Sequence, residues 1–363
     1  MRRISAQYAK LGMVLSMDVY DYYGNLVLQQ GTRLTVDNIA ALGKMGGGEI
    51  FFDDRRVDDV PVTPLMPSRL EGEAARKLHR LLEDVKSVMK SNGSLPKVDL
   101  NPIEKVIFSM VEQLFPVVMG EVNAIGCFSL RDYDRVHPVQ VIGLSLLMGR
   151  KIGFTESQLT SLGIAALLEN IGYLVLPPGM MDEPGELNAA EKRKVQEHPQ
   201  YGYQILKDYT NAVPEIAGVV LEHHERWDGS GYPRGLKGTN ISTCARILGI
   251  TDTYYALASR RPHRPSYLPH EAIECIMAYN GELFDPELVL LFTKLMPLYP
   301  TGVMVTLNTG ETGIVSDAKT GILGRPTVRV CYDKDLNELT KPFDMDLTDS
   351  EHQHRLVTGV AEY

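Results

Sequence analysis

The residues of this chain that could bind a metal are histidines and carboxylates near the ends of predicted helices. His223 and His224 are adjacent and open the stretch HHERWDGSGYP, which holds the only Trp of the chain. Neighbouring side chains on a helix point about 100° apart, because one turn holds about 3.6 residues. The pair would therefore suit two adjacent metal ions, which together can hold a phosphodiester and activate water. The alternative is a solvated helix end followed by a tight turn shaped by the glycines and the proline.

The other candidate ligands lie far apart in the sequence. Helical bundles commonly project metal ligands inward from several helices. Taken alone, each histidine is more often a surface or core residue than a ligand. Besides the adjacent pair, the candidates are His137, His198 and Asp252.

Composition restricts the class of protein. The chain has 363 residues, 44% hydrophobic and 23% charged, which is typical of a soluble protein of two or three domains. A formal net charge of -9 argues against a broad basic surface for duplex nucleic acid. The four cysteines form no CxxC pair, which is typical of a reducing compartment. Since no signal-peptide core and no run of about 18 apolar residues occurs, we expect a cytoplasmic protein without a membrane span.

The hydrophobic pattern predicts a mainly α protein, with a helical bundle between two small β-rich modules. Strand-like runs around Tyr23-Gly24-Asn25 predict a hairpin, and Thr35 or Asp37 is expected to cap the helix that follows. Segment 53–69 contains three prolines and is predicted to be a linker. Further helices are predicted at 101–125, 135–151, 156–170, 189–209, 213–225, 242–258, 269–280 and 285–296. The predicted parts are an N-terminal β-rich module (1–66), a helical linker (67–124), a helical domain (125–297), a small β module (298–345) and a loose polar tail (346–363).

Six stretches, in consistent order, resemble the HD-GYP domain. This is a family of bacterial metal-dependent phosphodiesterases that open cyclic di-GMP. The HHExxDGxGYP block is the most specific part of the resemblance, which covers about residues 125–297. It implies an HD-type helical bundle and a role in bacterial signal transduction. The stretches are HPVQV, AALLENIG, EHPQYGYQIL, LEHHERWDGSGYPRGLKG, ARILGITDTYYALASRRPHR and FDPELV.

The resemblance also implies roles for single residues. Tyr133 stands where some members carry a glutamate for a third metal, so a three-metal centre is not expected. Tyr232 matches the tyrosine of the GYP motif. Arg261 and Arg264 match basic positions that bind the nucleotide's phosphates, a task suited to the planar guanidinium fork. The metal ligands that it implies are His137, His198, His223, His224 and Asp252.

The chain departs from the family at the name-giving His-Asp pair, which is Glu169-Asn170 in the stretch ENIGY. The missing Asp bridges two metals in the family, whereas Asn170 is neutral, and two close dications need an anion between them. Glu169 lies one residue earlier, so we expect it to ligate the ion of the absent His but not to bridge. Tyr173 replaces a lysine implicated in substrate contact, and no catalytic residue is assigned.

These differences lead to an expectation about the metal. We expect one divalent ion, of Fe, Mn, Zn or Ni, or weak occupancy rather than two ions. A metal-free pocket in which Glu169 and Asn170 form hydrogen bonds is the alternative.

The expected function is a cyclic di-GMP signalling protein of HD-GYP type with a degraded metal centre. It would bind the nucleotide, a signalling protein, or both, with little or no hydrolysis. One alternative is an active phosphodiesterase that gives pGpG or GMP, and another is a structural or interaction module without nucleotide. The sequence leaves open the partner, a homodimer and the signal read by residues 1–66.

Overall fold

The computed structural model describes most of the chain. The described residues are 1–45, 49–60, 62, 64–91, 94–117, 133–177, 180, 188–259, 267–319, 321 and 324–361, with side chains at 115–117 and 133–136 excluded. Arg261 and Arg264 lie outside the described residues, as does the side chain of Tyr133. The chain divides into two compact units. One consists of the described residues of Met1–Arg69 and Thr293–Tyr363, and the other of the described residues of Leu70–Met119 and Asp132–Phe292.

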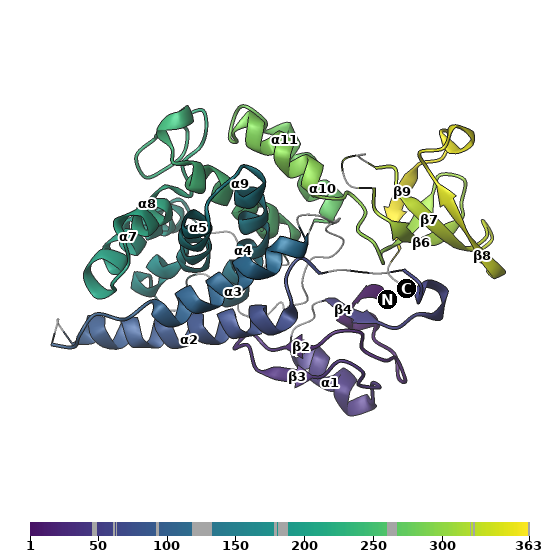
Figure 1. Cartoon of the computed structure of the whole chain (residues 1–363), viewed down its shortest axis with the longest axis horizontal. Coiled ribbons are helices and arrows are strands. Elements are labelled where there is room, and N and C mark those ends of the chain that lie inside the picture. The colour runs from purple at the N-terminus through teal and green to yellow at the C-terminus, as the bar shows by residue number, and fades with distance from the viewer. Residues whose placement is uncertain are drawn as a thin grey trace. The chain divides into compact units, whose positions relative to one another are not determined.

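The second unit is helical, as the hydrophobic pattern predicts (Figure 1). The predicted helix at 189–209 is divided in two, and the others begin and end within a few residues of the predicted positions among the described residues. Its elements are α2 (Ser68–Lys90), α3 (Asn101–Val117), α4 (Tyr133–Lys151), α5 (Glu156–Leu168), η3 (Ile171–Val175), α6 (Ala189–Val195), α7 (His198–Tyr209), α8 (Pro214–Glu222), η4 (Gly238–Asn240), α9 (Thr243–Ala258), α10 (Pro269–Ala278) and α11 (Pro286–Leu295).

Helix α5 lies at the centre of this unit and is apolar on nearly every side. Thr155 begins it with a capping box, in which its hydroxyl accepts from the backbone N–H of Gln158. From Leu159 to Leu168 almost every residue is buried, and α5 packs against α3, α4 and α8. Among the described residues, Glu156–Val175 is long and apolar enough to span a membrane, with a mean hydropathy of 1.2. Its burial inside the unit explains that composition, because a helix that is apolar all round belongs to a core.

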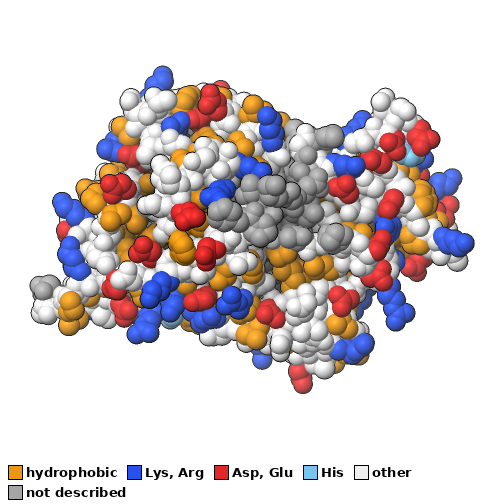
Figure 2. Space-filling view, in the orientation of Figure 1, with side chains coloured by type: hydrophobic (Ala, Val, Ile, Leu, Met, Phe, Trp, Pro, Cys, Tyr) orange, Lys and Arg blue, Asp and Glu red, His pale blue; other side chains and the backbone are white. Residues whose placement is uncertain are grey.

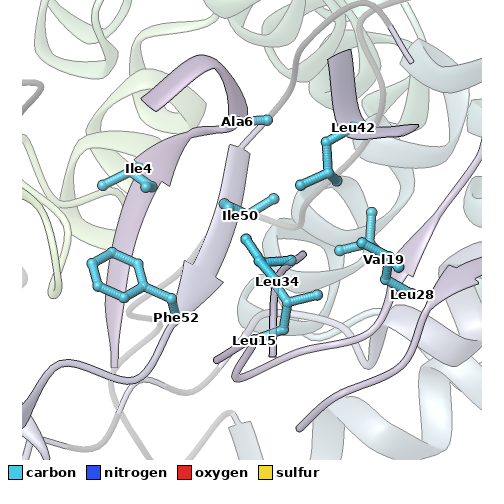
Figure 3. Packing of buried hydrophobic residues seen from close by; sticks show 9 residues of the cluster. All are labelled: Ile4, Ala6, Leu15, Val19, Leu28, Leu34, Leu42, Ile50 and Phe52. Atoms are coloured by element: carbon cyan, nitrogen blue, oxygen red, sulfur yellow. The ribbon is translucent and has the colours of Figure 1, made fainter. Parts of the chain in front are cut away.

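The N-terminal part of the first unit is a small α/β module. Strands β1 and β4 pair antiparallel, and β2 and β3 form the hairpin predicted around Tyr23-Gly24-Asn25. Thr35 caps α1 through a capping box with Asn38, as predicted. Figure 3 shows the buried side chains that fill this module, among them Ile4, Leu34 and Ile50. The elements are β1 (Arg2–Ser5), η1 (Ala6–Tyr8), β2 (Val19–Tyr20), β3 (Leu26–Leu28), α1 (Val36–Lys44), β4 (Glu49–Phe52) and η2 (Arg55–Val57).

The C-terminal part is a five-stranded antiparallel sheet of order β8-β7-β6-β5-β9. The prediction of a loose tail at 346–363 is wrong. Strand β9 pairs with β5 at the sheet edge, and Leu347 is fully buried. The elements are β5 (Met304–Leu307), β6 (Thr312–Asp317), β7 (Thr327–Tyr332), β8 (Glu338–Asp346), η5 (Ser350–His352) and β9 (Val357–Val360).

The two ends of the chain belong to the same unit, and the segment predicted as a linker connects them. Val57 and Val60 are buried in a cluster with Met304, Ile314 and Cys331 of the sheet. The linker prediction for 53–69 is therefore wrong for its first part, because Val57 and Val60 pack on the C-terminal sheet. The expected fold class, mainly α with small β-rich parts at both ends, is confirmed.

Candidate metal centre

Three side chains from separate helices meet in the core of the helical unit. His137 comes from α4, Glu169 follows the last residue of α5, and Asp252 lies in α9. His137 Nε2 is 2.8 Å from Asp252 Oδ1 and 3.3 Å from Glu169 Oε1. All three side chains are buried, and their ligand atoms lie within 4.8 Å of one another. We call His137, Glu169 and Asp252 the carboxylate group.

A second set consists of histidines alone. His198 is the first residue of α7, while His223 and His224 follow α8 directly. Their nitrogens also lie within 4.8 Å of one another. The rings of His223 and His224 lie 4.1 Å apart between centroids, and nitrogens of both belong to one group of three, whereas the pair was predicted to suit two adjacent ions. We call His198, His223 and His224 the histidine group.

Hydrogen bonds fix the tautomers of two of these histidines. His198 Nδ1 is 2.8 Å from the carbonyl oxygen of Val195, and His223 Nδ1 is 2.7 Å from that of Val220. A carbonyl oxygen only accepts, so both Nδ1 atoms carry hydrogen. Burial lowers the pKa of His198 to about 3 and that of His223 to about 4, so both rings are neutral.

Their Nε2 atoms therefore both carry lone pairs, and these two atoms are 3.2 Å apart. Two acceptors at that distance repel each other unless a cation lies between them. Imidazoles held by Nδ1–H bonds to backbone carbonyls are also the usual arrangement of metal-ligating histidines. The histidine group thus fits a metal ion.

Asp252 lies between the two groups. Its Oδ1 faces His137, and its Oδ2 is 3.8 Å from His224 Nδ1. Burial would raise the pKa of Asp252, but the hydrogen bond from His137 and the nearby histidines lower it, so this carboxylate is ionised. Asp252 is therefore an anion that both groups can share.

His137 of the carboxylate group is protonated, so a proton supplies the positive charge that a bound metal ion would supply. Burial opposes protonation of His137, but hydrogen bonds to Asp252 and Glu169 raise its pKa to about 9. Burial, followed by repulsion from Asp252, raises the pKa of Glu169 to about 7. Glu169 Oε2 is buried without a hydrogen-bond partner. A buried carboxylate oxygen without a partner is unfavourable in the protein alone and is available to a cation.

The side-chain amide of Asn170 offers a hydrogen-bond donor beside Glu169. Its Nδ2 donates to Glu169 Oε1 over 3.3 Å, the same oxygen that faces His137. An amide NH₂ group is not a metal ligand and carries no charge. Tyr173 follows in η3, with its ring 4.5 Å from that of His198.

Gly172 brings the 169–173 segment against the histidine group. A Cβ atom at this position would lie 1.9 Å from the carbonyl oxygen of His198 and 2.8 Å from the backbone nitrogen of Gly202. The backbones of η3 and α7 therefore touch, which no other residue type permits. Gly172 was not among the predicted site residues, although the stretch ENIGY contains it.

The loop after α8 places Tyr232 at the histidine group, where its ring is 4.8 Å from that of His224. Glu225 is buried and holds the loop, since its carboxylate accepts from the backbone N–H groups of Arg234 (2.7 Å) and Leu236 (2.8 Å). This loop-holding role of Glu225 was not predicted, although Glu225 directly follows the adjacent histidines. Gly231 fits because a Cβ atom there would lie 2.3 Å from the backbone nitrogen of Arg226.

All six residues predicted as ligands are thus brought together in two groups of three. Four imidazoles and two carboxylates suit a borderline transition metal such as Fe, Mn, Zn or Ni. The helical unit corresponds to the fold that the HD-GYP resemblance implies.

A model of the HD domain family matches residues 105–288, which is half of the chain. The chain belongs to the HD domain family. Several relatives of this HD protein are named as enzymes of cyclic dinucleotide breakdown. The cyclic di-GMP phosphodiesterase PA4108 of Pseudomonas aeruginosa is 34% identical over 201 residues, 55% of this chain and 48% of that protein. A cyclic di-GMP phosphodiesterase of Thermotoga maritima is 36% identical over 160 residues, 44% of each chain.

A third relative is named for a different dinucleotide. The 3'3'-cGAMP-specific phosphodiesterase 3 of Vibrio cholerae is 35% identical over 169 residues, 46% of this chain and 36% of that protein. The HD protein thus matches about half or less of the length of these relatives. Among solved structures, the HDG"Y"P protein Bd1817 of Bdellovibrio bacteriovorus is similar with a TM-score of 0.48 and 15% identity, covering 79% of this chain and 97% of that one. The resemblance to HD-GYP proteins is confirmed at the level of the HD domain and these phosphodiesterase relatives.

Proposed function

We propose that this HD protein is a cyclic di-GMP signalling protein that binds the dinucleotide at the two ligand groups and hydrolyses it slowly or not at all. The relatives named as cyclic di-GMP and cGAMP phosphodiesterases support a 3',3'-cyclic dinucleotide as the ligand class. We assign the protein to the cytoplasm, where such nucleotides occur. A protein partner would read the bound state.

The main observation in favour of slow hydrolysis is the contact between Asn170 and Glu169. At the position where the family resemblance implies a bridging carboxylate, an amide N–H donates to Glu169 instead. The carboxylate group therefore lacks one negative charge. Two dications at close range would thus lack one of the anions that offset their repulsion in the family, although Asp252 remains.

The residues at the centre would each have a defined task. His198, His223 and His224 would hold one divalent ion, and Asp252 would contribute a carboxylate that this ion shares with His137 and Glu169. Such an ion supplies Lewis acidity, by drawing electron density from phosphoryl oxygens and lowering the pKa of water. Tyr232 would pack against the nucleotide beside His224. Arg261 and Arg264 would bind its phosphates in bidentate fashion.

An active phosphodiesterase is the second candidate, and a specific observation favours it. The two oxygens of Asp252 face different groups, at 2.8 Å from His137 and 3.8 Å from His224. Asp252 could thus take over the bridging task, while the free Oε2 of Glu169 adds a further ligand atom. In that case the product would be pGpG or GMP.

Binding and turnover separate the candidates. Titration calorimetry of the full chain with cyclic di-GMP, with Mn(II) or Fe(II) present, is expected to show binding, while chromatography shows little linear product. The double variant Glu169→His, Asn170→Asp should raise turnover at least about tenfold, because ligand-shell changes commonly alter activity 10–100-fold. Asn240→Asp makes the same Asn-to-Asp change at an exposed position and should change nothing.

Two outcomes would contradict the proposal. Rapid product formation by the unaltered protein would favour the active phosphodiesterase. If no heat of binding is detected, the remaining candidate is a structural or interaction module without nucleotide.

A further inference from the structure

A cavity of about 490 Å³ lies in the helical unit, between α2, the start of α3 and the segment that joins them. None of the six predicted metal ligands lines it. Its volume falls in the range of about 300–1,000 Å³ that is typical of sites for small organic molecules. Along α2, at the lower left of Figure 2, Lys and Arg side chains lie among Asp and Glu side chains. The chemistry of the lining residues therefore decides which ligand fits.

One wall of the cavity is apolar. Leu81 and Val88 of α2 and Ile103 of α3 line it and are buried. Leu95 of the joining segment also lines it, and its side chain is 48% exposed. We call these four residues the apolar wall. A ligand with an apolar side chain would remove this surface from water, which is favourable in proportion to the area covered.

Hydrogen bonds hold the joining segment in place. The backbone N–H of Val98 donates to the carbonyl oxygen of Tyr209 (2.8 Å), and the carbonyl oxygen of Val98 accepts from the backbone N–H of Asn211 (3.1 Å). Asn211 Oδ1 also accepts from the backbone N–H of Leu100 (2.9 Å). A wall that is already formed lowers the entropy that a ligand must offset on binding.

Two cationic side chains of α2 line the cavity. Lys77 and Arg80 are one helical turn apart. Lys77 is half-buried and forms no ion pair among the residues that the structure describes. Arg80 Nε is 3.9 Å from Asp84 Oδ2, and both of these side chains are mostly exposed. Exposed pairs of this kind contribute little to stability, so the carboxylate of a ligand can compete for Arg80.

Two carboxylates line the cavity as well. Asp84 lies two turns after Lys77 on α2, and Asp99 belongs to the joining segment. The backbone N–H and the side-chain amide of Asn101 donate to Asp99 over 3.1 and 3.2 Å, and Asn211 Nδ2 donates over 2.8 Å. These hydrogen bonds lower the pKa of Asp99, so it is an anion in a fixed position. A carboxylate has about four lone-pair sites, so Asp99 can accept from one further donor.

The spacing of the charges sets the length of the ligand. Lys77 and Asp84 are seven residues apart on α2, which corresponds to about 10 Å along the helix axis. An extended peptide spans about 3.3–3.6 Å per residue, so about three residues cover this distance. A single amino acid is too short, because its ammonium and carboxylate are attached to the same carbon atom.

We infer that this cavity is a binding site for a short apolar peptide of about three residues with free termini. Its carboxylate lies at Lys77 and Arg80, and its ammonium group lies at Asp84 and Asp99. Its central side chain packs against the apolar wall. A fatty acid would leave the two aspartates without a counter-ion, and an alkyl amine would leave Lys77 without one.

Calorimetry on the full chain, with capped and uncapped peptides, tests the site. The probes are the tripeptide Ala-Leu-Ala, its N-acetyl form, its C-terminal amide and Gly-Gly-Gly. We expect Ala-Leu-Ala to bind with a Kd of about 1 mM or below, and each capped form about fivefold more weakly, because each cap removes one charge. Gly-Gly-Gly should bind at least about tenfold more weakly than Ala-Leu-Ala, because it lacks the leucine side chain.

Charge-removing variants show which end of the peptide each residue binds. Lys77→Gln should weaken binding of Ala-Leu-Ala about fivefold and leave the affinity for its C-terminal amide unchanged, because the amide has no carboxylate to lose. Asp84→Asn should likewise weaken binding of Ala-Leu-Ala and leave the affinity for its N-acetyl form unchanged. Lys90→Gln, an exposed lysine of α2 that does not line the cavity, is the matched control.

Several results would overturn the inference. These are no binding of Ala-Leu-Ala at about 20 mM, equal affinity for the capped and uncapped peptides, or equal losses in Lys77→Gln and Lys90→Gln. A dimer in sedimentation velocity that dissociates in Asp84→Asn would assign the cavity to a second copy of the chain instead. Because the readout is peptide binding at a site without metal ligands, it does not depend on whether the metal centre binds a nucleotide.

Discussion

At the residue scale, the sequence predicted the types and identities of the six ligand candidates but not how they group. That these six side chains lie close together was predictable, because a specific motif identified them as candidate ligands. The grouping of His223 with His224 was not predictable, because the directions of the two rings depend on side-chain rotamers that the packed neighbours select. The contact of Asn170 with Glu169 could not be predicted from the sequence either, because the packed neighbours set the direction of a side-chain amide.

Glu71 gives a prediction at the same scale, away from the metal centre. It lies buried in α2 with Oε2 lacking a partner, and burial raises its pKa to about 8. In the unfolded chain this carboxyl has a pKa of about 4.3, so the unfolded state binds fewer protons between these values. The free energy of unfolding should therefore fall as pH rises from about 4.5 to 8, by up to about 1.4 kcal/mol per pH unit.

Replacement of Glu71 by glutamine should remove that slope. Urea unfolding at a series of pH values should find Glu71→Gln about 3 kcal/mol more stable than the unaltered chain at pH 7 and equal to it near pH 4. The matched change Glu83→Gln, at an exposed position on the same helix, should leave the slope unchanged. A parallel pH dependence for Glu71→Gln and the unaltered chain would show that this carboxyl is not responsible.

At the element scale, helix starts were predictable where a side chain marks them. Thr35 caps its helix through a local hydrogen bond, and so does Thr155, hence local sequence suffices. Strand β9 was not predictable in this way, because its partner β5 is about 50 residues earlier in the chain. The close approach of η3 to α7 likewise depends on tertiary packing.

Gly172 allows a direct test of that approach. A methyl group at this position would overlap the His198 carbonyl, so Gly172→Ala should destabilise the helical unit by about 3 kcal/mol or more. Gly218→Ala is the control, because the space around Gly218 in α8 is open and alanine favours helices by up to about 1 kcal/mol. Denaturant unfolding followed by circular dichroism measures both. Equal stability of the two variants would refute the contact.

At the scale of the whole molecule, the sequence indicated separate modules at the two ends, whereas the structure joins them in one unit. The joining contacts connect residues about 240 or more positions apart, so no local pattern could reveal them. Arg329 of β7 is the main example. Its guanidinium pairs with Asp59 of the N-terminal part and, at 2.9 Å, with Asp344 of β8.

Loss of this arginine should loosen the joint unit and leave the helical unit intact. We expect Arg329→Gln to lower the free energy of unfolding of the first unit by up to about 2 kcal/mol, because it removes two ion pairs with exposed carboxylates, each worth about 1 kcal/mol or less. Hydrogen exchange should speed up at residues 55–60 and in β7, but not in α4 or α5. Lys341→Gln, at an exposed position of β8, should have no such effect. Faster exchange in α4 and α5 alone would contradict the division into units.

The most direct test of the whole account is the number of metal ions per chain. Plasma mass spectrometry of the full chain, purified without chelators from cells supplied with Fe and Mn, should find no more than about one ion in the unaltered protein and close to two in Glu169→His, Asn170→Asp. Two ions in the unaltered chain, together with rapid hydrolysis of cyclic di-GMP, would contradict it.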